Sequence, residues 1–139
     1  MRKRLGEILL ESNLITEKQL HLALLYKKAK KQKLGTTLVR MGFVTDTQVA
    51  GALSAKLHLP LIECGKRAID SKLKSIIPKA LAQQEGIFPL EIRNGTLLLA
   101  MADPLNYRVL DDISFRTNLR VQPAVSDEYD IHTAIERNY

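Results

Sequence analysis

Residues 4–27 read RLGEILLESNLITEKQLHLALLYK, and residues 33–56 read KLGTTLVRMGFVTDTQVAGALSAK. When the first stretch is shifted by 29 positions onto the second, eight of the 24 overlaid positions are identical and several others keep their residue class. Each copy carries an apolar stripe that it cannot bury by itself, so a neighbouring copy is needed to cover it. The sequence therefore predicts a duplicated helix-turn-helix domain over residues 1–58.

The first helix of each copy is short. Leu5 and Leu9 lie on one face of a helix expected over residues 5–12. This helix should end at Asn13, because asparagine and glycine adopt the left-handed conformation that closes many helices, and the equivalent residue of the second copy is Gly42.

The second helix of each copy begins at a capping box, in which a threonine hydroxyl and a glutamine amide satisfy backbone N–H groups of the first turn. The two boxes are Thr16 with Gln19 and Thr45 with Gln48. Helices over residues 17–31 and 46–58 should follow. Each has an apolar inward face, formed by Leu20, Ala23 and Leu24 in the first copy and by Val49, Ala52 and Leu53 in the second. Each face ends in a lysine, Lys27 or Lys56, and the helix dipole alone explains poorly why these lysines lie on the inward face.

The second helix of the first copy also carries Leu22, Leu25 and Tyr26 outside its inward face. A stripe of this width needs a cover on a second side. Either the C-terminal half of the chain or another chain should supply it.

From Leu59 onward the chain alternates short strands and short helices. Strands are expected over residues 87–93, 96–102 and 119–125, with a short extended edge at 59–62, and helices over 71–77, 79–85, 106–116 and up to about 137. Asn94-Gly95 suits a type I′ turn in a hairpin. The predicted fold class is α+β, in which residues 59–139 form a small domain whose sheet has three or four mainly antiparallel strands.

Composition and charge limit the class of protein. Of 139 residues, 45% are hydrophobic, and the apolar runs are far shorter than the roughly 18 residues of a spanning helix, so we expect a cytoplasmic protein without membrane insertion. Residues 1–56 hold eleven Lys/Arg against four Asp/Glu, whereas residues 57–139 hold ten against eleven. Such a localised basic surface either serves solubility or binds a nucleotide, a nucleic acid, membrane headgroups or an acidic protein.

The sequence contains no evident catalytic constellation. Its three histidines lack the spacing of metal ligands, and its one cysteine, Cys64, reads as a small buried residue rather than a nucleophile. Neither a Walker-type phosphate loop nor a dinucleotide-binding glycine motif is present. We therefore expect no catalytic residues, no metal and no enzymatic activity.

The repeats instead offer two equivalent anion sites. Gly6 and Gly35 fall in the first turn of a helix, where free N–H groups attract anions and a missing side chain lets a ligand approach. Four cations accompany them in two matched pairs, namely Arg4, Lys27, Lys33 and Lys56. A two-fold symmetric dianion of two nucleotides fits such a surface. Helix contact through glycine explains Gly6 and Gly35 equally well.

This doubled motif, with its five-residue spacer at 28–32, resembles the MshEN domain family, which forms the N-terminal region of type II secretion and type IV pilus assembly ATPases of the GspE type. Many members of that family bind the bacterial second messenger cyclic di-GMP. Downstream stretches such as Phe88-Pro89-Leu90 and residues 100–104 are similar to the same region, so the resemblance covers nearly the whole chain.

The resemblance implies a set of residues that bind cyclic di-GMP. They are Arg4, Leu5, Gly6, Leu9, Asn13, Leu14 and Lys27 in the first copy, and Lys33, Leu34, Gly35, Leu38, Gly42, Phe43 and Lys56 in the second. Four depart from the family pattern, since Lys33 replaces an arginine, Asn13 a glycine, and both Lys27 and Lys56 a glutamine. Lysine keeps the charge of arginine but loses its planar, two-pronged donation.

The leading hypothesis is a non-enzymatic regulatory domain that binds cyclic di-GMP and no other cofactor. The alternative is a protein-docking module of a secretion or pilus motor that has lost nucleotide binding, with an inner-membrane platform protein or the motor ATPase as its partner. A DNA-binding protein is a third reading. Leu22, Leu25 and Gly51 stand where a groove-reading helix needs polar side chains, so no nucleic acid is expected.

Overall fold

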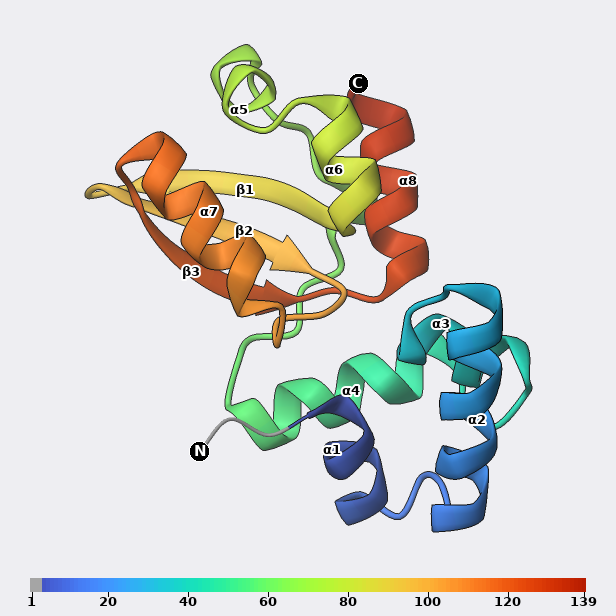
Figure 1. Cartoon of the computed structure of the whole chain (residues 1–139). Helices are drawn as coiled ribbons and strands as arrows, with labels where there is room; N and C mark the ends of the chain where they lie inside the picture. Colours follow the sequence, from blue (N-terminus) through green and yellow to red (C-terminus); the bar gives the residue numbers. More distant parts are fainter. Residues whose placement is uncertain (1–3) are drawn as a thin grey trace. The chain divides into compact units, whose positions relative to one another are not determined.

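The computed structural model describes residues 4–139, which form two compact units (Figure 1). The first unit ends at His58, and the second runs from Leu59 to Tyr139. Within the described residues the first unit has helices and no strand, whereas the second combines helices with a sheet, which confirms the α+β class.

Residues 4–58 contain four helices in two short-long pairs. They are α1 (Leu5–Glu11), α2 (Glu17–Lys30), α3 (Leu34–Arg40) and α4 (Asp46–Leu57). Both predicted capping boxes are present, with matching hydrogen bonds of 2.9 and 3.1 Å in each copy. Asn13 and Gly42, at φ values of 57° and 78°, follow α1 and α3 in the left-handed conformation, as predicted.

The helices of the two copies pack reciprocally. The short helix α1 packs mainly against α4, and the short helix α3 packs mainly against α2. Each long helix is therefore covered by the short helix of the other copy, which is why a single copy could not bury its own apolar stripe.

The two long helices are buried to different extents. In α4 the predicted inward face is buried through Val49, Ala52 and Leu53, whereas α2 buries Ala23 and leaves Leu24 44% exposed. Leu24 was expected to be buried on the inward face of this helix. Helical periodicity identifies which residues share a face, but it does not show whether a neighbour reaches that part of the face.

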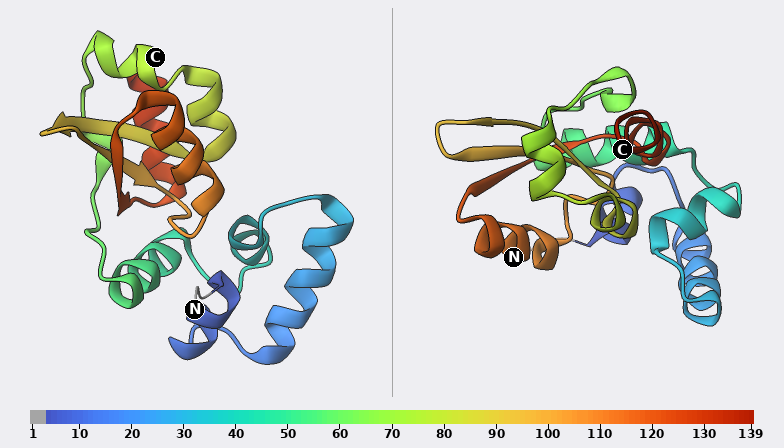
Figure 2. Two further views of the ribbon diagram at one scale, coloured as in Figure 1. Left: turned by 60° about the vertical axis from the view of Figure 1, so that its left-hand side comes forward. Right: turned by 90° about the horizontal axis from the view of Figure 1, so that it is seen from above.

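The second unit follows the predicted order of helices and strands, and it adds a 3-10 helix at Cys64–Lys66 that was not predicted. The predicted elements are α5 (Ser71–Ile76), α6 (Lys79–Glu85), β1 (Ile87–Arg93), β2 (Thr96–Met101), α7 (Tyr107–Thr117), β3 (Arg120–Val125) and α8 (Glu128–Asn138). Asn94 and Gly95 have φ values of 52° and 75°, as a type I′ turn requires. Both views in Figure 2 keep α6 and α8 side by side, in agreement with their packing contacts.

The sheet is three-stranded and mixed, in the order β1-β2-β3. The β1-β2 hairpin is antiparallel as predicted, but β3 pairs in parallel with β2, which differs from the expected mainly antiparallel sheet. The reason is α7, because a helix between two neighbouring strands carries the chain back to the starting edge. The expected extended edge near Pro60 forms one isolated parallel bridge, Leu61 to Val125.

Candidate functional site

The two motif starts occupy equivalent positions. Arg4 and Lys33 are the N-caps of α1 and α3, both have extended backbones, and both side chains are exposed and form no capping bond. The helices α1 and α3 also contact each other, and a Cβ atom added to Gly35 would lie 3.4 Å from Leu5 Cδ2. The first turns of the two short helices therefore lie side by side, next to the two cations.

Gly6 and Gly35 differ in their surroundings. Gly6 is buried, and a Cβ atom at this position would lie 2.9 Å from Leu20 Cδ1. Gly35 is half-buried and has room for a methyl group. Close packing thus accounts for the glycine at position 6, whereas it does not require one at position 35.

The residues after the turns repeat one geometry. The amides of Leu14 and Phe43 donate to the carbonyls of Leu9 and Leu38, at 3.1 Å in both copies. Leu9 and Leu38 are fully buried, while Leu14 and Phe43 are half-buried, as are Leu5 and Leu34. Of the predicted apolar ligand residues, Leu9 and Leu38 therefore lie in the core and support the surface from beneath.

The two lysines at the ends of the long helices are not equivalent in charge environment. Lys27 is half-buried at the end of α2, whereas Lys56 is exposed, with its Nζ atom 4.0 Å from Glu11 Oε2. This ion pair is weak, because both side chains are 40% exposed. The counterpart of Glu11 in the second copy is Arg40, so the repeat does not provide Lys27 with the same acidic neighbour.

Sequence reasoning missed one residue that positions the second motif. Thr37 is fully buried, and its hydroxyl donates to the Lys33 carbonyl at 2.9 Å and lies 3.3 Å from Gln32 Oε1. These contacts fix the spacer and the start of α3. The signal was available, since Thr37 is a polar residue at the position where the first copy has Ile8.

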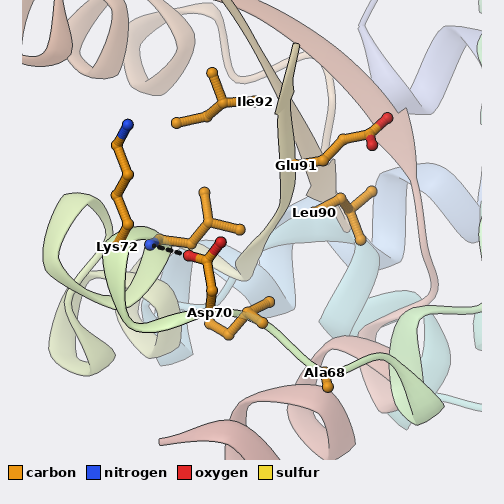
Figure 3. Close-up of a pocket in the computed structure, with 8 residues that line it drawn as sticks. Ala68, Asp70, Lys72, Leu90, Glu91 and Ile92 are labelled. Atoms are coloured by element: carbon orange, nitrogen blue, oxygen red, sulfur yellow. Dashed lines mark hydrogen bonds between the residues drawn. The ribbon is translucent and has the colours of Figure 1, made fainter.

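A cavity of about 610 Å³ lies in the second unit between α5 and β1 (Figure 3). Its lining includes Lys72, Leu90 and Ile92, together with Asp70, whose carboxylate accepts a hydrogen bond of 3.0 Å from the Leu73 amide. It contains none of the predicted ligand residues. Among residues 4–139, no group of three or more His, Cys, Asp or Glu side chains is arranged to hold a metal ion.

Comparison with known proteins gives the family. A family model described as the MshEN domain matches residues 57–139, which is more than half of the chain. The chain belongs to the MshEN domain family. The matched part of this MshEN chain is the second unit with the end of α4, so the doubled motif lies outside the match.

Three relatives extend the comparison to the whole chain. The type IV pilus assembly ATPase PilB of Myxococcus xanthus is 31% identical over 139 residues. The structure of MshE with cdg, which denotes cyclic di-GMP, has a TM-score of 0.77 at 27% identity and covers 99% of this chain and 100% of that one. The N-terminal domain of XpsE shares the fold, with a TM-score of 0.83 over 100% of this chain and 99% of that one at 24% identity.

The MshEN chain corresponds to a small part of the curated relatives. It spans 25% of the length of the Myxococcus PilB and 16% of the PilB of Thermus thermophilus. Within residues 4–139, no helix combines the length and the apolar character needed to span a bilayer.

Proposed function

We propose that this MshEN domain binds cyclic di-GMP through its two tandem motifs. The observation that carries the proposal is the likeness over nearly the full chain to MshE, whose structure was solved with that ligand. The contact between α1 and α3 supports it, because this contact brings Leu5 next to Gly35. Arg4 directly precedes Leu5, and Lys33 lies two residues before Gly35, so both cations start near this contact.

Each class of residue has a role in this proposal. Arg4 and Lys33 meet the phosphates or guanines as cations. The backbone of Gly35 admits a close approach of the ligand, because this residue is only half-buried and carries no side chain. The half-buried side chains of Leu14 and Phe43 cover the bases, and Lys27 and Lys56 close the two ends of the site.

The domain would act as a regulator rather than as an enzyme. This chain corresponds to only 25% and 16% of the length of two relatives that are named as pilus assembly ATPases. We therefore propose that ligand binding here controls a cytoplasmic motor ATPase of a secretion or pilus system, directly or through an inner-membrane platform protein.

Calorimetry tests the proposal. Cyclic di-GMP titrated into the chain at moderate salt should bind with micromolar or tighter affinity, and Arg4→Ala should weaken binding by at least about 1.4 kcal/mol, a tenfold change. Arg93→Ala is the matched control, because it removes an exposed arginine from the second unit. If no binding heat appears at ligand concentrations near a millimolar, the proposal fails and the docking module is the better reading.

A further inference from the structure

The outer face of α2 exposes an apolar stripe. Leu22, Leu25 and Tyr26 are 44%, 57% and 43% exposed, and Ala29 is exposed as well. Their spacing of three, four and seven residues places all four on one helical face. A contiguous apolar face that is open to water is typical of a binding surface.

The second copy of the repeat has no equivalent apolar stripe. In α4 the equivalents of the three large side chains are Gly51, Ser54 and Ala55. The helix α4 nevertheless has the same capping box and buries more of its residues than α2 does. The repeat pattern itself therefore gives no reason for the apolar stripe of α2.

The charges around the stripe define its partner. Lys18, Lys28 and Lys30 are exposed on α2, which carries four lysines against one glutamate. A second copy of the chain would bring the same positive charge to the contact and be repelled. The partner should therefore be negatively charged as well as apolar.

We propose that the outer face of α2 binds the surface of membranes that contain anionic phospholipids. An exposed helix face is convex and suits a flat, deformable surface, whereas a protein partner would need a matching groove. Leucine and tyrosine side chains can enter the boundary between headgroups and acyl chains, while lysines reach back to the phosphates. This binding is peripheral, and it goes beyond the proposed nucleotide binding because it needs neither Arg4 nor Lys33.

Co-sedimentation with vesicles tests this proposal without nucleotide. The chain should bind vesicles of phosphatidylcholine mixed with phosphatidylglycerol, bind poorly to phosphatidylcholine alone, and lose binding as salt is raised. A variant with Leu22→Ala, Leu25→Ser and Tyr26→Ala should bind at least about tenfold more weakly, because the lost side chains supply the apolar contact. Circular dichroism and thermal melting establish that this variant is folded.

Charge variants separate a specific surface from general attraction. Lys18→Gln, Lys28→Gln and Lys30→Gln together should weaken binding by about tenfold or more. Lys66→Gln, Lys74→Gln and Lys79→Gln remove the same charge from the second unit and should leave most of the binding intact. The proposal is overturned if anionic vesicles do not bind, or if the stripe variant binds as the wild type does. It is equally overturned if the wild type self-associates through the stripe instead.

Discussion

Gly6 and Gly35 occupy the same position of the repeat but have different neighbours. Leu20 fills the space beside Gly6, whereas Gly35 meets Leu5 at an ordinary contact distance. Because packing explains one glycine and not the other, the two alternatives that the sequence left open for these residues can be tested separately, one at each position.

Gly35→Ala should leave the free energy of unfolding unchanged or raise it by about 0.5 kcal/mol, since alanine is favoured in a helix and has room there. Binding of cyclic di-GMP should fall at least about tenfold if the backbone of Gly35 meets the ligand. Gly6→Ala is the matched control, and it should be less stable than Gly35→Ala by about 1 kcal/mol because Leu20 must move. Unchanged ligand affinity in Gly35→Ala would remove Gly35 from the site.

Tyr139 gives the second unit a dependence on alkaline pH. Its hydroxyl donates to the Ile77 carbonyl at 2.5 Å, and burial raises the pKa of Tyr139 to about 12 from an ordinary value of 10.0. Since the folded pKa is the higher one, the stabilisation is fully present below about pH 10 and is lost as pH rises towards 12.

Tyr139→Phe should lower the free energy of unfolding by about 1 kcal/mol at pH 8, because the Ile77 carbonyl loses its donor. Denaturant unfolding measures this change. An absorbance titration of the phenolate should show one tyrosine of the wild type ionising near pH 12 and no such step in the variant. Four tyrosines that all ionise near pH 10 would contradict the assignment.

At the scale of helices and strands, local signals in the sequence were sufficient to locate the elements of the second unit, but not to pair its strands. The predicted helices and strands of the second unit appear within two residues of their expected bounds, because caps, turns and periodicity act over a few neighbouring residues. The parallel pairing of β3 was not predicted, although a helix between two strands is its usual sign. The signal was in the sequence, but strand partners are chosen by tertiary packing and not by the strands themselves.

The end of α3 can be tested through the turn that closes it. Gly42 has a φ of +78° and open space around the position of a Cβ atom, so a substitution there changes conformational energy alone. Gly42→Ala should cost about 1 kcal/mol of stability, whereas Gly42→Asn should cost less than about 0.5 kcal/mol, because the first copy uses Asn13 in the same conformation. Urea unfolding compares the two variants. An asparagine as costly as the alanine would show that the turns are not equivalent.

At the scale of the whole molecule, the duplication was visible in the sequence, but the reciprocal packing was not. A repeat shows that each helix needs a partner, and it does not say that α1 pairs with α4 and α3 with α2. The prediction of the candidate site was limited in the same way, because the sequence does not show which helices pack together. Arg4 and Lys33 were predicted as ligand residues from the motif alone, whereas the burial of Leu9 and Leu38 depends on which helix covers them.

The second unit has a core of its own, which includes Cys64, and this core should open independently of the repeats. Cys64 is fully buried, and burial raises the pKa of its thiol, so a disulfide reagent should label it at least about a hundredfold more slowly in the native chain than in denaturant. Tyr139→Phe should speed labelling about fivefold, in proportion to about 1 kcal/mol of lost stability.

Gly42→Ala is the control for this experiment, because it weakens the repeat unit by a similar amount and lies outside the core that holds Cys64. Its labelling rate should match that of the wild type, since the opening of one core does not expose a thiol in the other. If Gly42→Ala accelerates labelling as much as Tyr139→Phe does, the two cores open in one cooperative step. A change in the stability of the repeats would then also change how often the core of the second unit opens.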